Sequence, residues 1–127
     1  MRLKSDLVPL LLATAQGRLD SVEIEWDPRP AVCVVMASGG YPGTYDKGYQ
    51  ISGLEDIESS DDLQVFHAGT ARKNGKLVTN GGRALGVTAL GDTIEQARDR
   101  AYEAVEQIQF EKRYFRRDIA AKAISAQ

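Results

Sequence analysis

The fold is decided by the segment KLVTNGGRALGVTALG, which spans residues 76–91. Two runs that favour β-structure flank Asn80-Gly81-Gly82, a tripeptide that accepts positive φ and turns the backbone at little steric cost. Arg83 follows this turn directly and begins the second run. Because side chains alternate along a strand, Arg83 shares the parity of the residues expected to face a core, which are Leu85, Val87 and Ala89.

Arg83 has two interpretations. At the mouth of a strand, beside the backbone N–H groups of a glycine turn, its guanidinium would form a site for an anion such as phosphate. The alternative is an arginine at a strand end that forms an ion pair with a surface carboxylate and binds no ligand. Spacing alone favours the ion pair.

Composition limits the class of protein. A chain of 127 residues is about one domain. Its 16 basic and 18 acidic residues nearly balance, so charge indicates neither a nucleic-acid nor a membrane partner. No apolar run approaches the roughly 20 residues of a membrane span, and the N-terminus lacks the pattern of a signal peptide. We therefore expect a cytoplasmic protein.

The strand pattern predicts a mainly antiparallel sheet of about five strands. The run from 31 to 37 is continuously apolar, which predicts a strand covered on both faces, with Cys33 as a small buried residue rather than a reactive thiol. Asn74-Gly75 is a strong signal for a two-residue hairpin turn. The remaining predicted strands are residues 49–52, 63–69, 71–73, 76–79 and 83–90.

Three helices are predicted. Residues 6–16 have apolar residues at helical spacing with Asp6 as N-cap, and we expect this helix to pack on the domain that follows. A long amphipathic helix begins after a capping box formed by Asp92 and Glu95 and should lie across the sheet. A short alanine-rich helix opens at Asp118. Together with the sheet, these helices indicate an α+β fold.

Residue types that carry catalysis are scarce. The chain has one histidine and one cysteine, and neither a nucleophile constellation nor metal-ligand spacing is present. His67 is interpreted either as a hydrogen-bonded structural residue or as a substrate-facing one. The basic and aromatic cluster at 112–117 is of a kind that binds nucleic acid or phosphate, although one short cluster in a neutral domain is weak evidence. We predict no catalytic residue and no metal site.

Several strings resemble a known family. ASGGYPG at 37–43, VFHAGT at 65–70, and LVTNGGR at 77–83 with LGVTALG at 85–91 are similar, in order and spacing, to the C-terminal domain of the phosphoribosylamine–glycine ligases, which are ATP-grasp enzymes also called glycinamide ribonucleotide synthetases. RLKSDL at 2–7 resembles the last helix of the ATP-grasp region, and FRRDI at 115–119 resembles the closing segment. The resemblance implies that residues 1–30 are the tail of the ATP-grasp domain with a connector and that 31–127 form the C-terminal domain.

The resemblance also implies a function. Enzymes of this family join glycine to 5-phosphoribosylamine in purine biosynthesis, with magnesium and with hydrolysis of ATP to ADP and phosphate. Their ATP and metal sites lie upstream of the segments that match this chain. The chain is therefore expected to be a C-terminal fragment that binds no cofactor by itself, is inactive alone, and has the upstream domains of the same enzyme as its partners.

The resemblance assigns substrate contacts to residues of the glycine-rich turns. In related enzymes an arginine before a similar Leu-Gly-Val strand holds the substrate phosphate, and Arg83 occupies the matching place. The other expected contacts to the ribose or phosphate are Asn80, Gly81, Gly82, Gly39, Gly40, Tyr41 and His67. A non-catalytic module that binds a phosphorylated ligand or a protein is the alternative, and a nucleic-acid binder is a poorer one.

Overall fold

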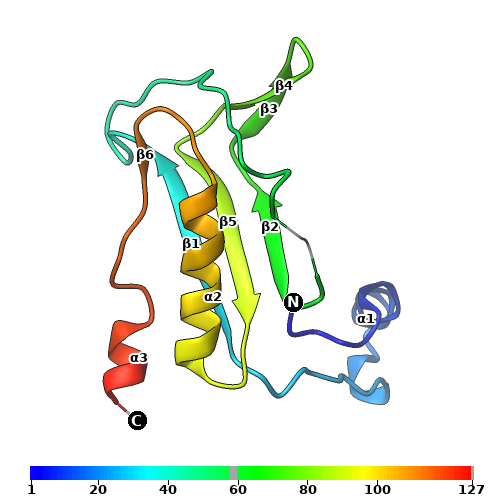
Figure 1. The fold of residues 1–127 in the computed structure, drawn as a ribbon. Helices are drawn as coiled ribbons and strands as arrows, with labels where there is room; N and C mark the ends of the chain where they lie inside the picture. Colours follow the sequence, from blue (N-terminus) through cyan, green and yellow to red (C-terminus); the bar gives the residue numbers. More distant parts are fainter. Residues whose placement is uncertain (58–59, 127) are drawn as a thin grey trace.

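A four-stranded antiparallel sheet with one long helix along one face forms the centre of the molecule (Figure 1). The computed structural model describes residues 1–57 and 60–126. The strand order is β2-β5-β1-β6, and every neighbouring pair is antiparallel. The strands are β1 (Ala31–Ser38), β2 (Leu63–His67), β5 (Arg83–Leu90) and β6 (Arg113–Tyr114). The α+β expectation and the antiparallel sheet are confirmed.

A separate hairpin extends from one end of this sheet. It consists of β3 (Thr70–Lys73) and β4 (Lys76–Thr79) and turns at Asn74 and Gly75, which both have positive φ. The predicted hairpin is therefore confirmed. The predicted strand at 49–52 is wrong, because this segment makes isolated bridges through Gln50 and Ser52 and no continuous ladder. The other predicted strands divide between two sheets. Those at 31–37, 63–69 and 83–90 correspond to strands of the four-stranded sheet, and those at 71–73 and 76–79 form the hairpin.

Strand β1 is buried on one face only. Val32, Val34 and Met36 face the long helix and are buried, whereas Cys33 and Val35 point the other way and are exposed. The prediction that this strand is covered on both faces, with Cys33 buried, is wrong. A continuous apolar run does not reveal that the helix covers a single side of the sheet.

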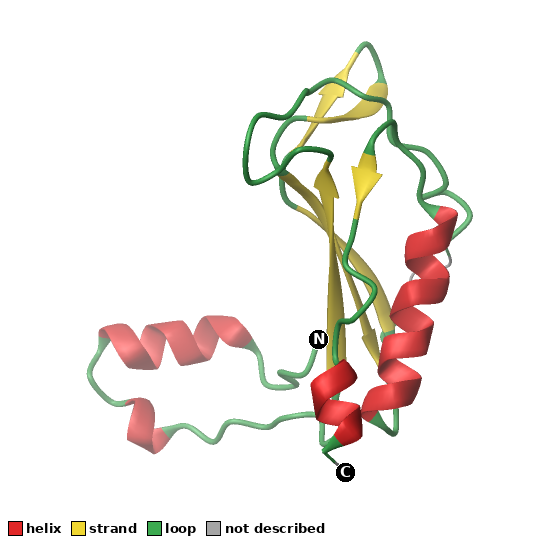
Figure 2. Cartoon of the chain, turned by 90° about the vertical axis from the view of Figure 1, so that its left-hand side faces the viewer, coloured by secondary structure: helices red, strands yellow, loops and turns green. Residues whose placement is uncertain are grey.

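The long helix, α2 (Ile94–Gln107), provides the covering layer (Figure 2). Its small residues make a close approach to the sheet possible, and this stripe is buried as predicted: Ala97, Ala101, Ala104 and Val105. Thr93, rather than Asp92, is the N-cap, since its Oγ1 accepts a hydrogen bond from the backbone N–H of Gln96. The cap motif therefore begins one residue later than predicted.

Helix α1 (Leu7–Ala15) and the short 3-10 helix η1 (Leu19–Ser21) form an arm that extends away from the sheet (Figure 2). The carboxylate of Asp6 caps α1 as predicted. The expectation that this helix packs on the following domain is wrong, because its principal contacts are with η1. Leu10 is buried, but four other large apolar side chains of this helix are half exposed or more: Leu7, Val8, Leu11 and Leu12.

An ion network fastens the base of this arm to the sheet. The buried carboxylate of Asp27 accepts hydrogen bonds from Nε and Nη2 of Arg29 at 3.1 and 2.9 Å, and these bonds lower the pKa of Asp27 to about 2. Arg29 also pairs with Asp62 at 2.9 Å, just before β2. The network therefore joins the segment before β1 to the segment before β2.

The last helix, α3 (Ala121–Ser125), begins later than predicted. Ala120 precedes it in the left-handed conformation, and the carboxylate of Asp118 pairs with Arg116 instead of capping the helix. The hydroxyl of Tyr102 on α2 donates to the carbonyl of Arg116 at 2.6 Å. The tail between β6 and α3 is therefore attached to α2 through its backbone.

Candidate functional site

A β-bulge determines where Arg83 points. Met36 pairs with Leu85 and Ala37 pairs with Arg83, so that Ala84 is an extra residue on β5. The extra residue reverses the alternation of side chains. Ala84 and Leu85 are both buried, and Arg83 is exposed and lines cavities on the open face of the sheet with Val35. The prediction that Arg83 shares the core-facing side with Leu85 is therefore wrong.

The guanidinium of Arg83 has no protein partner within residues 1–57 and 60–126. It forms neither a hydrogen bond nor an ion pair there, although Arg29, Arg113, Arg116 and Arg117 are all paired. The interpretation of Arg83 as half of a surface ion pair is wrong for this part of the chain. An exposed guanidinium without a carboxylate keeps its five N–H donors available to a ligand.

Arg83 lies beside a cavity of about 600 Å³, which we call the Phe66 hollow. Its floor is the open face of β1, β2 and β5, and its wall is Tyr41 in the loop after β1. Phe66 is 48% exposed, so the floor is apolar and accessible. The residues that line it are Val35, Tyr41, Phe66, Ala68, Gly69, Gly82, Arg83, Leu85 and Gly86.

A smaller cavity of about 210 Å³, the Tyr114 hollow, adjoins the first. The two cavities share Val35, Tyr41 and Arg83. The smaller one is lined by Cys33, Val35, Ala37, Tyr41, Arg83, Tyr114, Arg116 and Ile119. Arg83 and Tyr41 therefore belong to both cavities, and the C-terminal tail closes the smaller one.

The turn before Arg83 is fixed by backbone contacts. The hydroxyl of Ser38 donates to the carbonyl of Gly81 at 2.9 Å, and the N–H of Ser38 donates to the carbonyl of Gly82 at 2.7 Å. A Cβ at Gly69 would lie 2.6 Å from the Cα of Gly81, so both positions exclude side chains. These contacts position the start of β5 beside the cavities.

The glycines of the first turn serve the loop itself. Gly40 has φ of 96°, and a Cβ there would collide with the carbonyl of Thr44. A Cβ at Gly39 would lie 2.7 Å from the carbonyl of Lys112. Both glycines thus allow close packing of the loop that carries Tyr41, and neither lines the two hollows.

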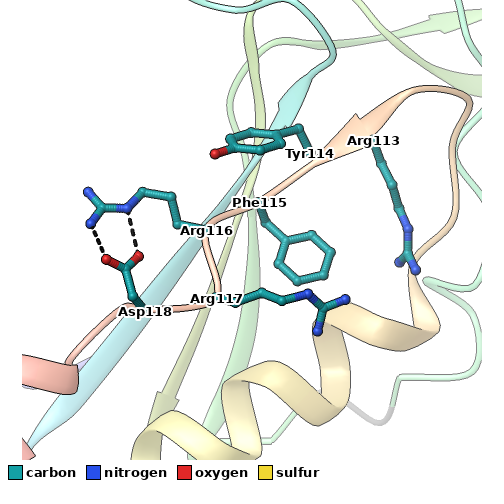
Figure 3. A pocket seen from close by; sticks show the side chains of 6 residues that line it. All are labelled: Arg113, Tyr114, Phe115, Arg116, Arg117 and Asp118. Atoms are coloured by element: carbon teal, nitrogen blue, oxygen red, sulfur yellow. Dashed lines mark hydrogen bonds and ion pairs between the residues drawn. The ribbon is translucent and has the colours of Figure 1, made fainter.

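The residues of the C-terminal tail alternate between two sides (Figure 3). Arg113, Phe115 and Arg117 lie toward α2, where each guanidinium is about 5 to 6 Å from the Phe115 ring and contacts Glu106. Arg113 also donates to the carbonyls of Val105 and Ile108 at the end of α2. A cavity of about 550 Å³ runs along residues 113–118.

This alternation separates the basic cluster into two groups. The arginines on the α2 side are engaged by the helix end, as expected for cations near helix C-terminal carbonyls. Tyr114 and Arg116 point the other way and line the Tyr114 hollow. The cluster therefore offers no continuous basic surface for a nucleic-acid backbone.

Comparison with known proteins identifies the family. A model for the C domain of phosphoribosylglycinamide synthetase matches residues 31–122. The chain belongs to this family. The resemblance carried by the glycine-rich segments of the sequence is thereby confirmed.

Relatives of this synthetase family cover almost the whole chain. A phosphoribosylamine–glycine ligase of Rhodopirellula baltica is 50% identical over 125 residues, which are 98% of this chain and 29% of that protein. The ligase of Vibrio cholerae is 52% identical over 125 residues, again 98% and 29%. The crystal structure of the Thermotoga maritima ligase aligns with a TM-score of 0.66 and 39% identity, over 85% of this chain and 27% of that one. The chain thus spans less than a third of the length of these relatives.

Within the synthetase C domain, the predicted site residues separate into two groups. Arg83, Gly82 and Tyr41 line the Phe66 hollow. His67 does not, and its Nδ1 lies 3.1 Å from Oγ1 of Thr70. Its role as a substrate contact stays a prediction. Four other residues predicted to contact the substrate line neither hollow, and their roles stay predictions: Asn80, Gly81, Gly39 and Gly40.

Tyr114 and Arg116 are cavity residues that the sequence analysis did not assign to the site. The signal that would have found them is the period of two in residues 113–117, which places 114 and 116 on one side.

In the described part of this C domain, no group of three or more histidine, cysteine or acidic residues could hold a metal ion. Across the same residues, no helix is long and apolar enough to cross a membrane.

Proposed function

We propose that this chain is the C-terminal part of a phosphoribosylamine–glycine ligase and that it binds the phosphate of 5-phosphoribosylamine. The observation that carries this proposal is the unpaired guanidinium of Arg83 at the edge of the Phe66 hollow. The family match and the identity to curated ligases supply the substrate class. The reaction forms N1-(5-phosphoribosyl)glycinamide from 5-phosphoribosylamine, glycine and ATP in purine biosynthesis, in the cytoplasm.

The chemistry of the hollow suits a sugar phosphate. A guanidinium presents parallel N–H donors that match two phosphate oxygens, and this geometry distinguishes arginine from lysine. Tyr41, 39% exposed, offers a ring and a hydroxyl to the ribose beside the phosphate. Arg83 would therefore supply charge and orientation, and Tyr41 and Gly82 the surface against which the sugar lies.

The remaining parts of the reaction are assigned to the upstream domains. ATP and magnesium would bind there, and this chain would be inactive alone because it contributes substrate contacts and no reacting group. Residues 1–30 would belong to the preceding ATP-grasp domain, and 31–127 would form the C-terminal domain. The exposed leucines of α1 are consistent with a helix whose packing partner is that upstream domain.

A kinetic comparison tests the role of Arg83 in a ligase that carries this sequence as its C-terminal part. Arg83→Gln should raise the KM for 5-phosphoribosylamine about 10- to 100-fold, the loss expected for charged hydrogen bonds of about 1.5–3 kcal/mol. The KM for ATP should change less than about twofold. Arg72→Gln is the matched control, because Arg72 is an exposed arginine of β3 outside both hollows.

Two results would contradict the proposal. Equal losses for both substrates would indicate a general structural defect, and unchanged kinetics would remove Arg83 from the site.

For the 127-residue chain by itself, the expected result is no shift of the melting temperature with magnesium and ATP. A stabilisation of several degrees would show that this chain contains a nucleotide site of its own.

A further inference from the structure

We propose that Arg116 is a second binding residue for the phosphate ester and that it acts from the C-terminal tail together with Arg83. This inference rests on the proposed function and adds a residue, and one of the two hollows, to the substrate site. Both arginines line the Tyr114 hollow, Arg83 from the start of β5 and Arg116 from the segment after β6.

The direction of Arg116 follows from the backbone of the tail. Its neighbours Phe115 and Arg117 lie toward α2, so Arg116 and Tyr114 extend to the opposite side (Figure 3). The carbonyl of Arg116 accepts from the Tyr102 hydroxyl at 2.6 Å. This bond fixes the position of the backbone without using the guanidinium.

The hollow combines two positive charges with an otherwise apolar lining. Cys33, Val35 and Ala37 come from the open face of β1, and Ile119 closes the end. Arg83 has no partner among the described residues, and Asp118 is the carboxylate that pairs with Arg116. A phosphate ester carries up to two negative charges, so one guanidinium balances it incompletely, and Arg116 adds to the balance to the extent that the phosphate replaces Asp118 as its partner.

The pair of Arg116 and Asp118 does not prevent this role. Nε and Nη2 of Arg116 donate to the two carboxylate oxygens at 2.8 and 2.6 Å, and both side chains are 63% exposed. Exposed ion pairs of this kind contribute little to stability because water and salt screen them. A phosphate in the hollow can therefore replace the carboxylate as partner of the guanidinium or bind it together with the carboxylate.

Arg117 is a matched control for Arg116. It is the adjacent residue and has the same chemistry, with a side chain that is 75% exposed. Its guanidinium contacts Glu106 and the Phe115 ring on the α2 side, away from the hollow. Any effect of net charge alone should therefore be equal in Arg116→Gln and Arg117→Gln.

The test is a titration of the 127-residue chain with ribose 5-phosphate, followed by NMR chemical shifts or calorimetry, with uncharged ribose as the ligand control. Arg83→Gln and Arg116→Gln should each weaken binding about tenfold, as expected for lost charged hydrogen bonds. Arg117→Gln should stay within about twofold of the wild type, the difference allowed for a distant charge. Arg116→Lys, which keeps the charge without the parallel donors, should give an intermediate affinity.

The outcomes separate this inference from the proposed function. If Arg83→Gln weakens binding but Arg116→Gln behaves like Arg117→Gln, the second guanidinium is disproved and the role of Arg83 stands. If Arg83→Gln has no effect, or if the chain prefers ribose 5-phosphate no more than ribose, both proposals fail. A lower melting temperature of Arg116→Gln with unchanged affinity would show a structural role and would also overturn the inference.

Discussion

The ring of Tyr41 lies directly against the Cα of Gly82, so that a Cβ at residue 82 would occupy the place of ring atoms. This contact joins the loop after β1 to the turn before β5 and places the ring between the two hollows. Gly82 is therefore required by its neighbour's side chain rather than by an unusual backbone conformation.

Gly82→Ala should displace the Tyr41 ring. The expected loss is about 1–3 kcal/mol of unfolding free energy, as for other overpacked sites, together with weaker binding of ribose 5-phosphate. Urea denaturation and ligand titration measure the two effects. The double variant with Tyr41→Ala should recover most of the lost stability, because the clash has then been removed. Additive losses in the double variant would show that the two residues do not interact.

Arg113 should be the most important arginine for stability. It is 21% exposed and donates to the carbonyls of Val105 and Ile108 at the end of α2, where the regular helical hydrogen bonds stop. Arg113→Gln should cost about 1.5–3 kcal/mol of unfolding free energy, the range for hydrogen bonds from a charged donor. Chemical denaturation measures this loss. Arg117→Gln, which removes the more exposed contact to the same Glu106, should cost less than about 1 kcal/mol. A loss as large for Arg117 as for Arg113 would contradict the assignment.

The Asp27 carboxylate should make stability depend on pH in the acid range. Hydrogen bonds from Arg29 lower its pKa from 3.8 to about 2 in the folded chain. The ionised form is favoured by folding, so its stabilising effect is complete above about pH 4 and is lost as the pH falls toward 2. Asp27→Asn should therefore lower the unfolding free energy at pH 7, whereas at pH 2 its unfolding free energy should be close to that of the wild type.

Denaturation at pH 7, 4 and 2 measures this effect. The exposed Asp61→Asn is the control and should follow the wild type at each pH. If Asp27→Asn lowers the unfolding free energy by the same amount at pH 7 and at pH 2, the carboxylate acts through packing alone. Arg29 keeps its charge throughout this range, so the change with pH reports on the carboxyl group.

Cys33 should be accessible to thiol reagents in the folded chain. It lies on the open face of the sheet and lines the Tyr114 hollow. Ellman's reagent should modify it at a rate close to that of the urea-unfolded chain, and ribose 5-phosphate should slow the reaction in the folded state. A thiol that reacts only after unfolding would show that this face is covered in solution. Cys33→Ser provides the blank.

Local signals in the sequence predicted most elements correctly. Asn74-Gly75 defines the hairpin, and the small residues of α2 form the buried stripe, because both depend on chain geometry within a few residues. The observed N-cap is Thr93, whereas Asp92 was predicted. Both residue types cap helices, and the hydrophobic pattern does not distinguish between adjacent positions.

Features that depend on contacts between residues distant in the sequence could not be predicted from these local signals. The bulge at Ala84 exists only in the pairing of β5 with β1, so alternation along β5 alone assigned Arg83 to the wrong face. The segment at 49–52 has strand-like residues but meets Val78 and Gln109 only at single bridges. Alternation groups Arg116 with Tyr114, but which side of the tail faces the sheet depends on its attachment to α2 through Tyr102, and the sequence does not specify that contact.

The single extra residue in β5 has a consequence for how this domain tolerates change in length. Deletion of Ala84 would place Arg83 directly before Leu85, and regular alternation would then keep the guanidinium on the open face opposite Ala37 while Leu85 stays in the core. Loss of this residue would thus remove the bulge without moving Arg83 across the sheet. A strand that kept Ala84 but paired without a bulge would instead turn Arg83 toward the apolar layer under α2, where a charge without a partner is strongly unfavourable.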